Sequence, residues 1–286
     1  MRIGDTSIDR LFLLSGEDLC LTEKITVKHP KLNDILSLSP AHRCDSIYWE
    51  YVCNLVCDSY DHMVWLDDSG VDYETISPFQ LFIMRWRDLN KQYIEKKEQF
   101  DQVGFNPLLP LSNALSFFWG CHNFAVGVLN NTDEPMDVIY DKNNPEYYIT
   151  SQEFNLITDF IKLINGVDNA GDRIHPKDSV GKKILIEDQR AELKRASQKR
   201  TDGTNDFIGD FVAGTLFGGN GGITPFNYRQ LPVYMVIDGL RTTKRKINYS
   251  HLTLMACAGA LENTNILAEE AVWEKHPPYL NTGGHK

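Results

Sequence analysis

The sequence predicts an α+β fold, with a small mixed N-terminal domain over residues 1–149 and a mainly helical region over residues 150–286. Three observations lead to this prediction. Alternating apolar residues within 136–149 flank the turn sequence DKNNP, which is typical of a β-hairpin. Beyond the hairpin, apolar residues recur at helical spacing instead. The 286 residues are 42% hydrophobic and 24% charged, so the chain can bury a sizeable core.

The elements before the hairpin follow from local patterns. Alternation predicts one strand over 19–28, which Pro30 ends, and a short helix follows over 31–38. Apolar residues at helical spacing predict a second helix from about residue 46 to residue 60. MVWL at 63–66 predicts a short strand or loop, and a turn-rich link follows it.

A longer helix is predicted to begin after Ser77, whose side chain can cap the first turn, with Pro78 at the first helical position. Its apolar pattern continues to about residue 100. The two prolines of NPLLPL then predict a loop before a short buried helix or strand at about 114–124. Together with the hairpin, these elements complete the predicted N-terminal domain.

The second region begins with a strong helix signal. Thr150 and Glu153 form the pattern of a capping box, and Gly166 closes the amphipathic helix that follows. Its apolar face is expected to comprise Phe154, Ile157, Phe160, Ile161 and Ile164. The later pattern predicts a charged helix, a Gly-rich linker and two closing helices, at 183–200, 214–222, 232–246 and 249–261.

The charge is unevenly distributed along the chain. Residues 1–150 contain 12 Lys and Arg against 23 Asp and Glu, whereas residues 151–286 contain 17 against 16. Such an acidic front half disfavours broad contact with phosphate backbones, which argues against a protein devoted to nucleic-acid binding. The opening sequence MRIGDTSIDRLFLLSG lacks the apolar region of a signal peptide, and no stretch is apolar enough to span a membrane. We therefore expect a soluble protein with reduced cysteines.

Motifs that suggest metal, phosphate or catalytic chemistry have simpler explanations here. Cys53 and Cys57 lie one helical turn apart with His62 nearby, yet a second ligand pair is missing, so two small hydrophobic residues are the preferred interpretation. The stretch GTLFGGNGGIT lacks the Lys and Ser/Thr of a phosphate loop and fits a flexible linker. Cys121 and His122 are adjacent, so their side chains would diverge. The sequence therefore indicates neither an enzyme nor a cofactor.

Two charged groups remain. The acidic cluster Asp67, Asp68, Asp72 and Glu74 lacks the register of a calcium loop and fits a solvated turn. Residues 182–200 hold seven basic side chains against three acidic ones, and RTTKRK at 241–246 adds a second basic group. A helix-turn-helix over 232–261 is conceivable, but its second helix lacks the Arg, Asn or Gln that read bases. Solvated basic faces, or docking sites for the acidic front half or an acidic partner, are preferred.

Aromatic residues near the C-terminal helices are candidates for partner binding. Side chains of this kind either complete a small helical core, which is the default, or anchor a partner. The candidates for partner binding are Phe226, Tyr228, Leu231, Tyr234 and Trp273.

Five stretches follow one another along the chain: ITVKHPKLNDILSL, LDDSGVDYETISPFQLFIMRW, YYITSQEFNLITDFIKLING, KKILIEDQRAELKRA and LPVYMVIDGLRTTKRKINYSHLTLMACAGAL. In this order they resemble the segments of tail-assembly chaperones from long-tailed bacteriophages of Gram-positive hosts. Within the second stretch, the resemblance rests on Gly70, Val71, Asp72, Tyr73, Ile76, Phe79, Leu81 and Phe82. The segment at about 114–131 has no counterpart.

The resemblance implies a non-catalytic factor without a cofactor. It would coat the tape-measure protein in the host cytoplasm until tail-tube subunits polymerise, with its C-terminal helices along the helices of the partner. The implied partners are the tape-measure protein, the tail-tube protein and a further copy of the chain, with no nucleic acid and no membrane. The alternative is a structural virion protein of the tail, neck or baseplate, and a third interpretation is a DNA-binding regulator.

Overall fold

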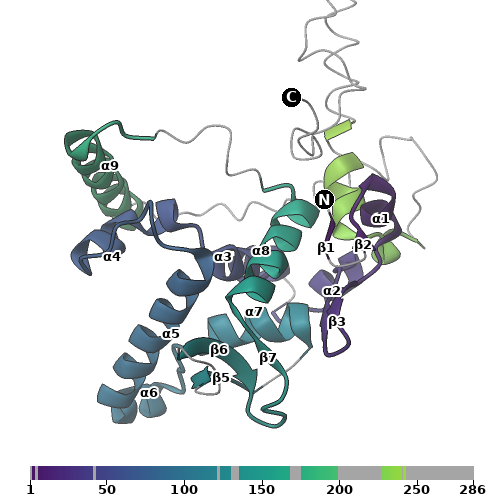
Figure 1. Ribbon diagram of the computed structural model, residues 1–286, viewed down its shortest axis with the longest axis horizontal. Helices are drawn as coiled ribbons and strands as arrows, with labels where there is room; N and C mark the ends of the chain where they lie inside the picture. The colour runs from purple at the N-terminus through teal and green to yellow at the C-terminus, as the bar shows by residue number, and fades with distance from the viewer. Residues whose placement is uncertain are drawn as a thin grey trace, which may run out of the picture.

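The computed structural model describes residues 2–3, 6–40, 43–120, 123–129, 135–167, 175–198, 227–239 and 241–242. Helices dominate this part of the chain and the strands are short and antiparallel, so the predicted α+β class is confirmed (Figure 1). The helices are α1 (Arg10–Ser15), α2 (Leu32–Leu36), α3 (Cys44–Val56), α4 (Met63–Asp68), α5 (Pro78–Glu95), α6 (Lys97–Val103), α7 (Leu109–Trp119), α8 (Ser151–Asn165) and α9 (Ser179–Gln198).

Three small antiparallel sheets lie among these helices. The first pairs β1 (Arg2–Ile3) with β2 (Thr6–Ser7), and the second pairs β3 (Leu19–Thr22) with β4 (Ile25–Val27). The third has the order β5–β6–β7, with β5 (Phe124–Leu129), β6 (Met136–Asp141) and β7 (Tyr148–Ile149). The predicted hairpin at 136–149 is therefore confirmed as β6 and β7, whereas β5 was not predicted as a separate strand.

The single strand predicted at 19–28 is wrong, because the chain turns back within it. The Thr22 hydroxyl accepts hydrogen bonds from the backbone N–H groups of Lys24 and Ile25, at 3.3 and 3.1 Å. A threonine side chain that binds the backbone two and three residues ahead favours a turn. The strand or loop predicted at 63–66 is also wrong: α4 forms there, with Met63 and Leu66 buried on one face and Gly70 at φ +73° after its end.

The predicted helix starts are confirmed at two capping boxes. At α5 the Ser77 hydroxyl accepts from the Gln80 N–H at 3.2 Å, and the Gln80 side chain accepts from the Ser77 N–H at 3.0 Å. At α8 Thr150 and Glu153 form the same reciprocal arrangement. Side chains that satisfy the free N–H groups of the first turn fix where a helix begins.

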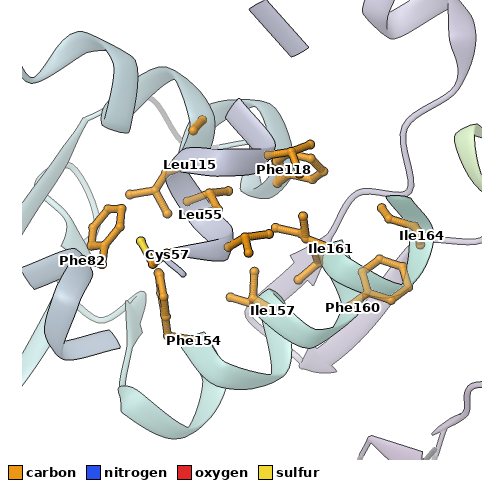
Figure 2. Packing of buried hydrophobic residues seen from close by; sticks show 14 of the residues in the cluster. Leu55, Cys57, Phe82, Leu115, Phe118, Phe154, Ile157, Phe160, Ile161 and Ile164 are labelled. Atoms are coloured by element: carbon orange, nitrogen blue, oxygen red, sulfur yellow. The ribbon is translucent and has the colours of Figure 1, made fainter. Parts of the chain in front are cut away.

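Helix α8 packs in the core against α3 and α5, and α3 in turn packs against α7 (Figure 2). Its predicted apolar face is confirmed, since Phe154, Ile157, Phe160, Ile161 and Ile164 are all buried. They share one hydrophobic cluster with Leu55 of α3, Phe82 of α5, and Leu115 and Phe118 of α7. The buried Tyr48 hydroxyl donates to the Asn165 side chain at 2.6 Å, which satisfies both polar groups inside the core.

Residues from both sides of the predicted boundary at 149/150 share this core. One hydrophobic cluster extends from Ile8, through α3, α5, α7 and α8, to Ile237. Residues 233–239 are helical and lie beside α1 in Figure 1, where they are drawn in yellow-green. The boundary at residue 150 therefore marks a change in secondary structure and does not separate two cores.

Candidate functional site

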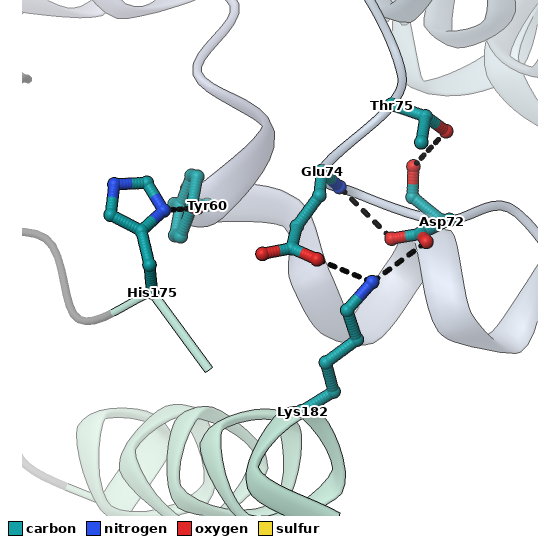
Figure 3. Close-up of polar contacts among 6 residues, drawn as sticks. All are labelled: Tyr60, Asp72, Glu74, Thr75, His175 and Lys182. Atoms are coloured by element: carbon teal, nitrogen blue, oxygen red, sulfur yellow. Dashed lines mark hydrogen bonds and ion pairs between the residues drawn. The ribbon is translucent and has the colours of Figure 1, made fainter. Parts of the chain in front are cut away.

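Helix α9 is attached to the rest of the chain by ion pairs, and this attachment is the first candidate site. The Lys182 ammonium lies 2.8 Å from the Asp72 carboxylate and also pairs with Glu74 (Figure 3). Two turns further along α9, the Arg190 guanidinium lies 3.0 Å from Asp68 and 3.7 Å from Asp67. The acidic cluster is therefore not a free solvated turn. The docking of the basic window onto the acidic front half, one of the alternatives from the sequence, is the arrangement observed.

Polar backbone contacts fix the register of α9 on α4. The Gln189 side chain accepts from the Val64 N–H at 3.0 Å and donates to the Tyr60 carbonyl at 2.6 Å. The Val64 N–H belongs to the first turn of α4, where backbone donors have no partner within the helix. Ile186 is the buried apolar contact of α9, with 7% of its surface exposed. One amide and one isoleucine thus align the two ion-pair clusters.

A polar pocket of about 400 Å³ lies beside this attachment. Its walls include Tyr60, Tyr73, Glu74, Lys162 and His175, and Cys57 is part of its lining. The rings of Tyr60 and Tyr73 meet edge to face, with their centroids 5.2 Å apart. The Tyr60 hydroxyl is 2.9 Å from Nδ1 of His175 (Figure 3). The pocket is therefore lined by rings and by charges of both signs.

The electrostatics of the attachment follow from these contacts. The hydrogen bond from Lys182 holds the pKa of the Asp72 carboxyl below its usual range, and a backbone hydrogen bond from Glu74 acts in the same direction. The hydrogen bonds to Asp72 and Glu74 raise the pKa of the Lys182 ammonium. Both groups are therefore charged over the whole physiological pH range.

The cysteine and histidine group does not form a metal site in the described residues. Burial raises the pKa of the Cys57 thiol to about 11 and also raises that of Cys53, so both thiols are protonated at neutral pH. Burial lowers the pKa of His62 to about 4. In the part of the chain that the structure describes, no three His, Cys, Asp or Glu side chains gather closely enough to hold a metal ion.

The residues predicted to bind a partner fall in different environments. Tyr234 is fully buried, so its ring is part of the core of this structure. Tyr228 and Leu231 are half-buried and pack against the same core. Phe226 and Trp273 lie outside the described residues, as do Cys121, His122, the linker at 214–222 and the predicted helix at 249–261.

Sequence reasoning missed the residues that align α9. Lys182, Ile186 and Gln189 recur at intervals of four and three residues, which places them on one helical face. That spacing could have identified the face, but it gives no information about the element that covers it. Gln189 has no charge to suggest a partner, and its two backbone contacts depend on tertiary structure alone.

No protein-family model, curated protein or solved structure matches this chain. Within the described ranges, none of the helices combines the length and the apolar character that crossing a bilayer requires.

Proposed function

We propose that this protein is a non-catalytic tail-assembly chaperone of a long-tailed bacteriophage, which keeps the tape-measure protein soluble in the host cytoplasm before the tail tube polymerises. The proposal begins from the order of the segments, which resembles that family over most of the chain. It needs a surface that can hold an apolar helical partner reversibly. Helix α9 supplies the observation that carries the proposal.

The face of α9 that points away from α4 carries exposed apolar side chains. Val180 and Ile184 are 62% and 57% exposed, and the helical repeat places Ile184 about 160° and Val180 about 120° around the helix from the buried Ile186. The attachment on the other face uses side chains that are themselves partly exposed, at 29% for Lys182 and 45% for Arg190. Ion pairs between partly exposed side chains are weak, so α9 can shift on its support without unfolding the core. An apolar stripe on such a helix fits the apolar face of a partner helix.

Co-expression with the tape-measure protein tests whether the exposed apolar face of α9 keeps that protein soluble. We expect Val180→Asp combined with Ile184→Asp to reduce the soluble fraction of the tape-measure protein while leaving the thermal stability of the chaperone unchanged. Leu11→Asp is the matched control, because Leu11 is 76% exposed on α1, at the opposite end of the molecule from α9 (Figure 1). Equal effects of the two variants would remove α9 from the proposal.

Mass spectrometry of purified phage particles and of the infected-cell lysate tests the role itself. A chaperone is abundant in the lysate and absent from mature particles. Stoichiometric presence in the particle would instead establish the alternative, a structural protein of the tail, neck or baseplate. Absence from both would overturn the phage assignment.

A further inference from the structure

Residues 227–239 and 241–242, the C-terminal segment, attach to the N-terminal part of the chain through one bridging residue followed by a helix. The Leu32 N–H donates to the Leu231 carbonyl at 2.9 Å, and the Val233 N–H donates to the Pro30 carbonyl at 2.9 Å. These two bonds form an antiparallel bridge that pairs Lys31 with Pro232. Recognition of this kind uses the backbone to fix the register of an incoming peptide.

A specific recess receives Pro232. Gly16 ends α1 at φ +70°, and a Cβ at this position would lie 2.3 Å from Cγ of Pro232. Only glycine adopts this backbone conformation without strain and also leaves room for the ring. Beyond the proline, Val233, Tyr234, Val236 and Ile237 are buried in the core, at 4%, 0%, 1% and 6% exposure.

Polar contacts hold the helical part of the segment. The Arg10 guanidinium of α1 lies 2.8 Å from the Asp238 carboxylate, whose side chain is only 7% exposed. The Arg241 guanidinium donates to the Gly166 carbonyl at 2.5 Å, at the C-terminal end of α8. A cation is favoured there because the helix dipole is negative at that end. The groove thus recognises a proline, an apolar helical face and two charges in a fixed order.

The connection between α9 and the segment is long enough for the segment to reach the groove of its own molecule or that of a second molecule. The backbone and polar contacts described above join it to residues between Arg10 and Leu32 and to Gly166. Residues 199–226 connect it to the end of α9. A connection of that length can span at most about 90 Å when extended, which exceeds the diameter of a small domain.

We propose that this groove is a peptide-binding site for a second copy of the chain, and that two copies exchange their C-terminal segments. Exchange creates no new contact, because each groove receives the same residues from the other copy. The segment of the same copy competes for each groove at an effective concentration of about 1 mM or below, as for other tethered segments, so exchange increases with protein concentration. Crowding along one elongated partner would supply such concentrations, but the exchange itself does not rest on the proposed function.

Two full-length variants test the exchange by complementation. The donor carries Gly16→Val, which blocks its groove and leaves its segment intact. The acceptor carries Tyr234→Asp, which removes its segment from its groove. We expect each variant alone to sediment as a monomer and the mixture to form a 1:1 heterodimer at about 0.5 mM, a concentration near the effective one. Adding Tyr234→Asp to the donor should abolish the heterodimer.

The wild-type chain provides a second measurement, which remains decisive if a variant fails to fold. Isotope-labelled and unlabelled protein are mixed at about the same concentration, and isotope-filtered NMR detects contacts between Pro232 of one copy and Gly16 of the other. Such contacts are the expected result. Folded variants that stay monomeric in the mixture, or a wild-type sample in which every Pro232–Gly16 contact is intramolecular, would overturn the proposal.

Discussion

The two parts of the chain that follow α8 attach to the core by opposite chemistry. The C-terminal segment buries four apolar side chains and adds two backbone hydrogen bonds, whereas α9 buries Ile186 and relies on ion pairs around Lys182 and Arg190. A fully buried aliphatic or aromatic side chain contributes about 1.5–3 kcal/mol, and an exposed ion pair about 0–1 kcal/mol. The segment closer to the end of the chain is therefore the more firmly attached.

This difference teaches that order along the chain does not determine which part is available to a partner. The resemblance suggested that the C-terminal helices lie along a partner. Residues 233–239, however, already pack into the core of the same chain. Helix α9 presents apolar side chains outward and is held by contacts that salt can weaken. The following predictions test the contrast, from the largest expected effect to the smallest.

The largest effect is expected at Tyr234. Replacing Tyr234 by alanine removes a fully buried ring, and such truncations cost about 3–5 kcal/mol of unfolding free energy. Denaturant unfolding followed by circular dichroism measures the loss. Tyr228→Ala, in the same segment but half-buried, should cost clearly less. An equal loss from both would show that the segment is not held by the burial of Tyr234.

A pair of glycines isolates the proline recess. Gly16 and Gly70 have similar backbone angles, φ +70° and +73°, but a methyl group added at Gly16 would meet Pro232, whereas one added at Gly70 would meet no described atom within 4 Å. Gly70→Ala should cost about 1–2 kcal/mol from backbone strain alone. Gly16→Ala should cost a further 1–3 kcal/mol, at about the level of other overpacked sites. Equal losses of unfolding free energy in the two variants would show that the space beside Gly16 is not needed to hold Pro232.

Much of this architecture could be predicted from the sequence where the signal is local. The capping boxes at Ser77 and Thr150 and the apolar face of α8 depend on residues three or four apart, and all three are confirmed. The turn at Thr22 was missed because the alternation continues on both sides of it. Helix α4 was missed because four apolar-leaning residues are too few to reveal a helical period.

The candidate site was less predictable because its partners are far apart in the sequence. Lys182 and Asp72 are both visible as charged residues, but their pairing depends on how α9 returns to α4, more than 100 positions along the chain. The recess at Gly16 depends on Pro232, which lies even further away. Charge and glycine patterns therefore identified candidates without identifying their contacts.

A lysine pair separates the ion-pair attachment from general charge effects. Lys182→Met removes the pairs with Asp72 and Glu74, and Lys183→Met makes the same charge change at a neighbour that pairs with none of the described residues. We expect faster hydrogen exchange over 179–198 in Lys182→Met at low salt, with the global stability nearly unchanged because exposed ion pairs contribute little. Salt at about 0.5 M should produce the same local change in the wild type, because it screens exposed ion pairs. Similar exchange in both variants would contradict the attachment described for Lys182.

The smallest effect is expected on the acid side. Because the pKa of Asp72 is lower in the folded protein, its contribution to the attachment is complete above the unfolded value of about 3.9 and is lost as the pH falls through the folded value. Amide signals of α9, followed by NMR as the pH is lowered from 6, should begin to shift below about pH 3.9, while those of residues 233–239 stay unchanged until the core itself unfolds. Asp72→Asn should make the α9 transition smaller, because Glu74, Asp67 and Asp68 still pair with α9, and should leave the core transition in place. If the signals of 233–239 shift together with those of α9, the two attachments respond as one unit and the contrast between them fails.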